Sequence, residues 1–286
     1  MFPWEKSQTW QLSPLTKVSV MNKKTGNKGK IYSLANQKGG VGKTTTTINL
    51  ASALAQLGHK VLVVDSDPQG NASSGLGVNT AKMEQHLYHC YLNEADVTQT
   101  IRQVDKDGLL FILPTHIDLI GVEVELITTP KRERFLSELL EPLLNSYEFI
   151  LIDCPPSLGL LTINALTASD AVIIPLQCEY FALEGLSQLV RTIRLVKNSY
   201  NQRLAIEGIV LTMYDRRNRL THQVAKEVKQ HFKSQVYDAV IPRNVRLSEC
   251  PSHGQSIHQY DSKSVGALSY MNLGKEFVKK QQEIRQ

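Results

Sequence analysis

A glycine-rich segment at residues 37–45 reads QKGGVGKTT and lies between a short apolar run and an apolar, helix-like stretch. Backbone N–H groups in such a turn point inward around phosphate oxygens, and the N-terminus of the following helix adds partial positive charge. We expect Lys43 to reach the β- and γ-phosphates and the Thr44 hydroxyl to bind Mg²⁺. The usual GxxxxGK[ST] pattern fails at Gln37, which replaces its first glycine, while a second lysine, Lys38, stands inside the loop. These residues predict a nucleotide-phosphate site.

Two further apolar runs end in carboxylates that suit the same site. Residues 61–64 precede Asp65 and Asp67, and residues 149–152 precede Asp153. An aspartate at the end of a buried strand holds the water shell of the metal in phosphate-loop proteins, so we expect Asp153 to be the second-strand partner of Mg²⁺. Asp67 is placed to orient or deprotonate the attacking water, and Asp65 to support the metal shell. The expected metal set is Thr44, Asp65, Asp67 and Asp153.

A single aspartate at a strand end is more commonly a helix N-cap than a catalytic group. Three of them in a chain that also carries GGVGKTT favour the catalytic interpretation. The sequence has no [NT]KxD motif, which would read guanine, so ATP is the expected nucleotide.

The elements that must position these residues alternate between short apolar runs and longer helical stretches. Continuous β-branched runs are typical of strands buried on both faces, and they occur at 31–35, 60–65, 109–114, 149–153, 171–175, 206–213 and 236–241. Helices are expected at 43–57, 131–146, 160–168, 182–199, 219–234 and 264–281. This alternation predicts an α/β fold with a doubly wound, mainly parallel sheet and ligand loops at the carboxyl ends of the strands.

Composition limits the class of protein. Of 286 residues, 42% are hydrophobic and 21% charged, which excludes a disordered or collagen-like chain. No apolar run approaches the ~20 residues of a membrane span, and the N-terminus lacks the apolar region of a signal peptide. The four cysteines are far apart, which fits a reducing cytoplasm. We expect a flexible basic extension at 1–29 and one domain at 30–286.

The net charge of +5 is unevenly distributed. Between Arg216 and Arg246 there are eight basic residues and two acidic ones. Such a basic zone indicates a polyanionic partner, although by itself a solvated helix face explains it equally well.

Four segments together resemble the ParA/Soj chromosome- and plasmid-partitioning ATPases: KGGVGKTTT, LVVDSDPQGNAS, FILIDCPPSLG and VIPRNVRLSECPSHGQSI. The resemblance runs from about residue 30 to residue 279 and implies the deviant-Walker P-loop fold, with ATP and Mg²⁺ as cofactors. It implies that Lys38 reaches the partner subunit's nucleotide in an ATP-sandwiched homodimer, that Lys43 is the catalytic lysine and that Asp67 activates water. Asp153 matches the Walker B aspartate. The implied nucleotide-binding set is Lys38, Gly39, Gly40, Val41, Gly42, Lys43, Thr44, Thr45, Met213, Pro242 and Asn244.

The resemblance also implies partners. ATP-bound dimers of this family bind DNA without sequence preference through arginines that match Arg217 and Arg246, both inside the basic zone. Arg216, Arg219 and Arg243 would widen this footprint. A ParB-type centromere-binding protein would stimulate slow ATP hydrolysis and release the dimer, which implies a cytoplasmic, nucleoid-associated protein without a membrane partner. The extension is too short for the helix-turn-helix domain of the larger plasmid proteins.

Other interpretations share the same nucleotide core. A MinD-like membrane-cycling ATPase would need an amphipathic C-terminal tail, for which QQEIRQ is poor, and a cobyrinate or dethiobiotin synthase would need a substrate pocket in place of the basic zone. An iron protein would need cysteines that pair across a dimer. His86 and His89 are spaced like metal ligands, but without a second cluster at zinc spacing they indicate a structural role. Cys154 is expected to be a small buried residue.

Overall fold

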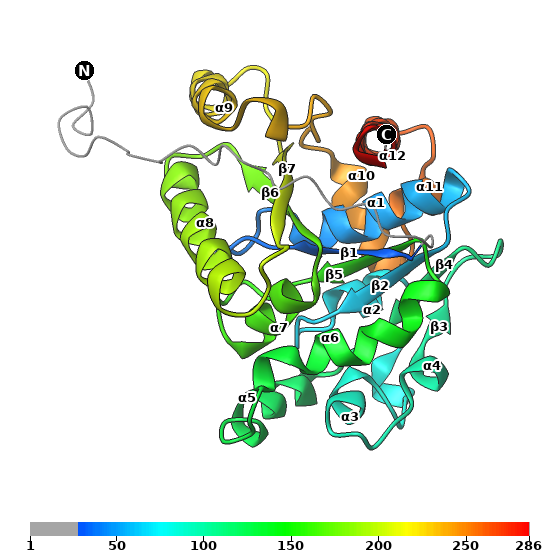
Figure 1. Ribbon diagram of the computed structural model, residues 1–286. Helices are drawn as coiled ribbons and strands as arrows, with labels where there is room; N and C mark the ends of the chain where they lie inside the picture. Colours follow the sequence, from blue (N-terminus) through cyan, green and yellow to red (C-terminus); the bar gives the residue numbers. More distant parts are fainter. Residues whose placement is uncertain (1–27, 286) are drawn as a thin grey trace.

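The computed structural model describes residues 28–285, so the extension predicted at 1–29 lies outside the described residues except for its last two positions. Seven strands form one sheet in the order β3-β4-β2-β5-β1-β6-β7 (Figure 1). Their bounds are β1 Lys30–Leu34, β2 Val61–Asp65, β3 Arg102–Gln103, β4 Leu110–Leu113, β5 Phe149–Asp153, β6 Ala171–Gln177 and β7 Ala205–Thr212. Neighbouring strands are parallel except for β3, which pairs antiparallel with β4. The predicted mainly parallel sheet is confirmed.

Helices cover both faces of this sheet, as crossovers between parallel strands require. The α-helices are α1 Lys43–Gln56, α2 Asn71–Gly75, α3 Leu87–Tyr91, α4 Val97–Thr100, α5 Gly121–Glu125, α6 Phe135–Leu140, α7 Leu160–Ala168, α8 Ala182–Ser199, α9 Arg219–Phe232, α10 Val245–Glu249, α11 Ile257–Tyr260 and α12 Val265–Arg285. Short 3-10 turns are η2 Thr80–Lys82, η3 Ile117–Ile120, η4 Arg132–Arg134, η5 Glu141–Asn145, η6 Lys233–Gln235 and η7 Cys250–His253.

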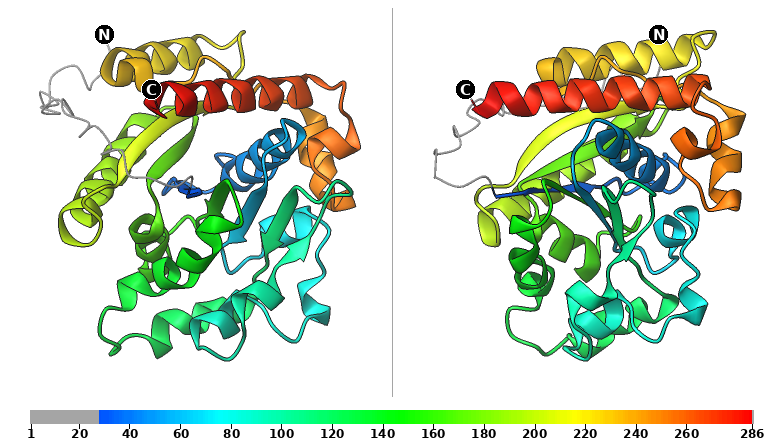
Figure 2. Two further views of the ribbon diagram at one scale, coloured as in Figure 1. Left: turned by 45° about the vertical axis from the view of Figure 1, so that its right-hand side comes forward. Right: turned by 90° about the vertical axis from the view of Figure 1, so that its right-hand side faces the viewer.

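Two apolar cores lie on opposite faces of the sheet. On one face, α1 and α12 run side by side, and Leu54 and Phe277 pack with Leu151 of β5 (Figures 1 and 2). On the other face, α6, α7 and α8 pack through residues such as Leu166 and Leu189. The doubly wound architecture is therefore confirmed. In the described part of the chain, no helix combines the length and apolar character needed to cross a membrane.

The strand predicted at 236–241 is wrong. Single bridges join Val236 to Ile209 and Pro242 to Tyr214, but no ladder connects them. The backbone N–H groups of residues 238 and 239 instead donate to the Glu276 carboxylate of α12, each at 2.9 Å. Residues 237 and 241 still donate to the carbonyls of Ile209 and Leu211 in β7, at 3.0 and 2.8 Å, so the segment contacts β7 without forming a continuous strand.

Two more differences concern local geometry. The helix predicted at 131–146 is divided into η4, α6 and η5, and Pro142 lies at the start of η5, where its missing N–H breaks continuous helical bonding. The short strand β3 was not predicted, because both of its residues are exposed and carry no apolar pattern. The remaining predicted strands and helices are confirmed, with ends shifted by a few residues.

Candidate active site

The carboxyl ends of β1, β2 and β5 meet at one edge of the sheet. Leu34 and Asp65 are both register partners of Asp153, so the three strands end side by side. The chain leaves β1 into the glycine-rich loop and then enters α1. The fold therefore places the loop directly above Asp65 and Asp153.

The glycine-rich loop has the backbone geometry of a phosphate cradle. Gly40 has φ 74° and Gly42 has φ 84°, in the left-handed region that glycine adopts without strain. Gly39 and Gly40 are exposed, and a Cβ atom added at either would meet no described atom within 4 Å. Gly42 caps α1 without a side-chain hydrogen bond, which leaves the N–H groups of the first helical turn available to an anion.

Asp153 is tied to the first turn of α1 by two hydroxyl groups. Thr44 Oγ1 donates to Asp153 Oδ2 at 2.7 Å, and Thr47 Oγ1 donates to Asp153 Oδ1 at 2.9 Å. The carboxylate is fully buried, and burial raises its pKa to about 6 although both hydrogen bonds oppose the shift. A hydroxyl beside a buried carboxylate is an oxygen donor set that fits hydrated Mg²⁺.

Lys43 lies under the loop with its charge largely removed from water. Its side chain is buried, and Nζ donates to the backbone carbonyl of Lys38 at 3.3 Å. Burial lowers the pKa of Lys43, and the nearby Asp153 carboxylate opposes that shift. A phosphate in the cradle would supply the anion that a buried ammonium needs, so these residues fit a nucleotide phosphate.

Asp65 and Asp67 play different structural roles. Asp65 Oδ2 accepts hydrogen bonds from the backbone N–H and the hydroxyl of Ser73, each at 2.7 Å. Burial and, to a lesser degree, the charge of Asp153 raise the pKa of Asp65 to about 8. Asp67 accepts from the backbone N–H of Gln69 at 3.0 Å and is 7% exposed, so it retains limited access to solvent. Asp65 is thus a support behind the site, whereas Asp67 is at its edge.

The predicted nucleotide-binding residues outside the phosphate loop lie near the end of β7: Met213, Pro242 and Asn244. Thr212 Oγ1 donates to the carbonyl of Val41 in the loop at 2.8 Å, and Met213 follows with φ 48°. Pro242 bridges to Tyr214 in the same region. Asn244 is half-buried, and its Oδ1 has no hydrogen-bond partner among the described residues. An acceptor buried without a partner requires one, and a nucleobase could supply it.

Lys38, the second lysine of the loop, is paired within its own chain. Its Nζ lies 2.5 Å from Glu179 Oε2, just after β6, and both side chains are nearly half-exposed. The backbone N–H of Lys38 donates to Asn36 Oδ1 at 3.0 Å, and Asn36 Nδ2 donates to the carbonyl of Pro175. Thr45, the last predicted loop residue, is the third residue of α1, and its carbonyl accepts a hydrogen bond from Asn49 Nδ2.

The predicted arginines gather near the carboxyl end of β7. The 213–218 loop and the 241–246 segment are joined by the backbone N–H of Tyr214, which donates to the carbonyl of Ile241 at 2.9 Å. Arg217 Nε pairs with Asp215 at 3.1 Å, and the hydrogen bond from Arg217 and the charge of Arg243 lower the pKa of Asp215. All five arginines are exposed: Arg216, Arg217, Arg219, Arg243 and Arg246.

Arg246 is set apart from the others by its ion pairs. Its guanidinium lies 2.9 Å from Glu249 and 3.7 Å from Asp261. Its side chain is 53% exposed, against 91% for Arg217. Any phosphate that binds Arg246 must therefore compete with two carboxylates.

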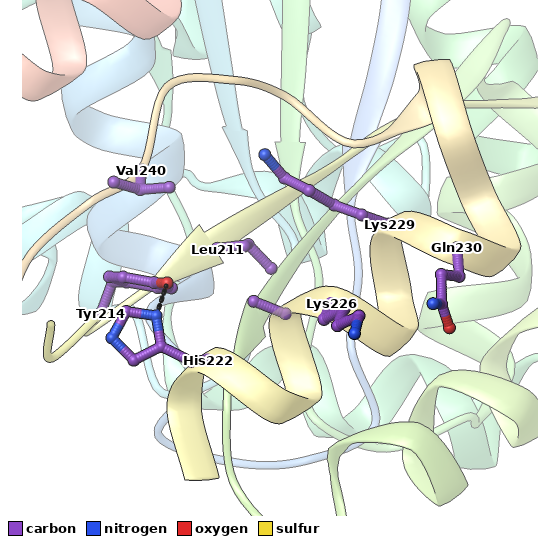
Figure 3. A pocket seen from close by; sticks show the side chains of 8 residues that line it. Leu211, Tyr214, His222, Lys226, Lys229, Gln230 and Val240 are labelled. Atoms are coloured by element: carbon purple, nitrogen blue, oxygen red, sulfur yellow. Dashed lines mark hydrogen bonds between the residues drawn. The ribbon is translucent and has the colours of Figure 1, made fainter. Parts of the chain in front are cut away.

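A cavity of about 460 Å³ lies between α9 and the end of β7, beside the arginine loops (Figure 3). Its floor includes Leu211 and Val240, and its rim includes Lys226 and Lys229. At one end Tyr214 Oη and His222 Nδ1 are hydrogen-bonded at 3.1 Å. The two lysines extend the positive surface along α9.

Sequence reasoning missed four residues that hold this site together: Thr47, Ser73, Thr212 and Glu179. Thr47 follows Lys43 by four positions, so helical spacing could have placed it on the face toward Asp153. The other three carry no local signal, because each meets its partner through contacts distant in sequence.

The phosphate loop between β1 and α1, above aspartates from β2 and β5, defines a P-loop nucleotide hydrolase of the deviant-Walker type. A family model described as an AAA domain matches residues 29–206. The chain is 56% identical to the sporulation initiation inhibitor protein Soj of Bacillus subtilis over 248 residues, covering 87% of this chain and 98% of Soj. It is 51% identical to the chromosome partitioning protein ParA of Caulobacter vibrioides over 261 residues, covering 91% and 97%. The chain belongs to the ParA/Soj family of chromosome-partitioning ATPases.

Solved structures share the fold more widely. The cobyrinic acid a,c-diamide synthase of Mycobacterium smegmatis, with bound ADP and magnesium, has a TM-score of 0.78 and 34% identity, covering 89% of this chain and 96% of the synthase. A protein of this fold therefore holds a nucleotide and magnesium. Because identity to the partitioning proteins is much higher, the predicted family and ATPase activity are confirmed, and partitioning is favoured over the synthase and MinD-like alternatives.

Proposed function

We propose that this chain is a DNA-partitioning switch driven by ATP. ATP and Mg²⁺ bind at the phosphate loop, two chains close around the nucleotides, and the homodimer binds DNA regardless of sequence. A ParB-type partner then stimulates hydrolysis and releases the dimer. The protein acts in the cytoplasm on the nucleoid, through one ATPase domain at 30–286 preceded by a basic extension at 1–29.

The chemistry is attack of water on the γ-phosphate, which yields ADP and phosphate. The loop N–H groups and Lys43 counter the charge on the phosphates, and Lys38 from the second subunit adds another positive charge. Asp67 orients the water and accepts its proton. Mg²⁺ held near Thr44 and Asp153 would neutralise charge on the phosphate oxygens.

One observation carries the DNA-binding part of the proposal. The 213–218 loop and the 241–246 segment both attach to the end of β7, which also touches the phosphate loop through Thr212 and Val41. Arginine contacts to phosphate are salt-sensitive and independent of sequence. Two chains in a dimer double the number of contacts, so ATP can raise DNA affinity without changing any one of them.

The experiment measures binding to an arbitrary duplex with ATP and with ADP, over a range of salt concentrations. We expect ATP-dependent binding in the wild type and its loss in Arg217→Ala/Arg246→Ala. Arg191→Ala/Arg203→Ala removes two exposed arginines from elsewhere on the surface and is the matched control. Binding that ignores the nucleotide, or that survives in the Arg217/Arg246 variant, would contradict the proposal. Absent DNA binding with ATP-dependent liposome flotation would favour the MinD-like alternative.

A further inference from the structure

A cluster of histidine and aspartate lies outside the phosphate loop, in segments thirty residues apart. His86 precedes α3, whereas His116 precedes η3 and Asp118 lies inside it. The backbone N–H of Leu87 donates to the carbonyl of Pro114 at 2.9 Å, which joins the two segments. The fold therefore supplies the second group of ligands that the spacing of His86 and His89 does not reveal.

The side chains of this cluster are within coordination range of one another. His116 Nδ1 lies 2.8 Å from Asp118 Oδ2, and His86 Nε2 lies 3.7 Å from the same oxygen. One ligand atom from each residue falls within 4.8 Å of the other two. Ligand atoms around a tetrahedral ion with bonds of 2.0–2.1 Å are roughly 3.3 Å apart, so small side-chain adjustments close the set.

His86 is the residue that a purely structural role explains least well. Its side chain is 4% exposed, and its buried Nδ1 has no hydrogen-bond partner within residues 28–285. Burial, helped by the neighbouring His89 and His116, lowers the pKa of His86 to about 4. His86 Nε2 is the ring nitrogen that faces Asp118, and at 3.7 Å it lies beyond hydrogen-bond distance of Asp118 Oδ2. An ion between these two atoms would bind both of them.

We propose that His86, His116 and Asp118 bind one divalent transition-metal ion of the zinc class, with water in the remaining position. Two imidazoles and one carboxylate suit Zn²⁺, whereas Mg²⁺ prefers oxygen ligands alone. Asp118 is 54% exposed, so an ion can enter from solvent. This site is separate from the proposed Mg²⁺ position. The two are linked through Thr115, the residue before His116, which donates its backbone N–H to Ser73 Oγ, and Ser73 in turn donates to Asp65.

The test uses the full chain saturated with ADP and Mg²⁺, so that the phosphate loop is filled, and measures Zn²⁺ affinity by competition with a chromophoric chelator. We expect one Zn²⁺ per chain and a dissociation constant raised at least about tenfold in His116→Gln and in Asp118→Asn. Both positions are partly exposed, which protects the fold. Matched controls are His253→Gln and Asp107→Asn, which make the same changes at exposed residues elsewhere.

Zn²⁺ should also raise the melting temperature of the wild type and the controls, but not of His116→Gln/Asp118→Asn, because binding to the folded chain stabilises it. Substoichiometric Zn²⁺ binding, or affinity unchanged in the double variant, would overturn the proposal. Loss of affinity in the controls to the same degree would also overturn it. None of these readouts depends on ATPase activity or DNA binding, so the partitioning proposal can fail independently.

Discussion

Thr44 and Asp153, from α1 and β5, are joined by a hydrogen bond of 2.7 Å between Thr44 Oγ1 and Asp153 Oδ2. The pair links the helix that begins at the phosphate loop to the central strand of the sheet. We expect Thr44→Ala to lower Mg²⁺-dependent ATP hydrolysis by about 100-fold, because the ion loses a ligand while the loop remains. Thr128→Ala, which makes the same change at an exposed residue outside the site, is the control. Turnover measured across a Mg²⁺ titration checks this, and equal effects of the two changes would contradict it.

Asp67→Ala should separate nucleotide binding from hydrolysis. Removal of the carboxylate leaves the phosphate cradle intact but leaves the attacking water without its base, so we expect ATP to bind and turnover to fall by about 100-fold or more. The ATP-bound dimer should accumulate in sedimentation experiments. Asp107→Ala, at an exposed turn, should behave as wild type. Normal hydrolysis by Asp67→Ala would remove the role assigned to this carboxylate.

The pair between Lys38 and Glu179 predicts a competition between intrachain and interchain contacts. If Lys38 crosses to a second subunit, it must first leave Glu179. An exposed ion pair is worth about 0.2–1 kcal/mol, so Glu179→Gln should strengthen the ATP-dependent dimer by about two- to fivefold. Lys38→Ala should abolish that dimer, and Glu184→Gln on the same segment should leave it unchanged. Sedimentation velocity with ATP measures all three, and a weaker dimer in Glu179→Gln would contradict this competition.

The raised pKa of Asp65 predicts the pH dependence of stability. Because burial lifts this pKa from 3.8 to about 8, the folded chain holds a proton there that the unfolded chain releases. The resulting stabilisation is complete below the unfolded value and is lost as the pH rises through about 8. Without nucleotide or Mg²⁺, we expect the melting temperature to fall from pH 6 toward pH 9 in thermal scans spaced about 1 pH unit apart.

Asp65→Asn keeps the size of this side chain and removes its titration. The amide cannot satisfy both Ser73 and the backbone of residue 67, so the variant is expected to be less stable at low pH. The slope with pH is therefore the informative quantity, and it should flatten. An unchanged slope would show that other groups cause the pH dependence.

Substitutions at two helical glycines are expected to change the free energy of unfolding in opposite directions. A Cβ atom at Gly274 of α12 would lie 3.1 Å from the Cβ of Ala53 in α1, whereas one at Gly185 of α8 would meet nothing within 4 Å. Gly274→Leu should cost about 1–3 kcal/mol by forcing α1 and α12 apart. Gly185→Ala should stabilise the fold by about 0.5–1 kcal/mol through helix propensity. Denaturant unfolding compares the two, and a destabilised Gly185→Ala would contradict the propensity argument.

The sequence predicted the sheet well where a strand is buried on both faces. Runs such as 149–152 are apolar throughout, as expected of a strand buried on both faces. The segment 236–241 has a similar composition, but two of its backbone donors bond to Glu276, which follows almost forty residues later. A hydrogen-bond acceptor so far away in sequence cannot be predicted from the local pattern of apolar residues.

The candidate site also contains some residues that local sequence patterns predict and others that they do not. Motif spacing sufficed for Lys43, Thr44 and Asp153, because a strand, a tight turn and a helix fix their relative positions. It could not reveal that Glu179 holds Lys38, or that His116 lies against His86. These contacts depend on how separate loops return to the same edge of the sheet.

Strand β7 has only one full neighbour in the sheet, β6, and its other side meets the irregular segment 236–241. That segment is held to β7 by backbone hydrogen bonds from residues 237 and 241 to the carbonyls of Ile209 and Leu211. The last residue of β7, Thr212, is hydrogen-bonded to the carbonyl of Val41 in the phosphate loop. A movement of Val41 on nucleotide binding would therefore be transmitted to β7 within a single chain. The strand is therefore a covalent and hydrogen-bonded link within one chain between the phosphate loop and the segment that carries Arg217.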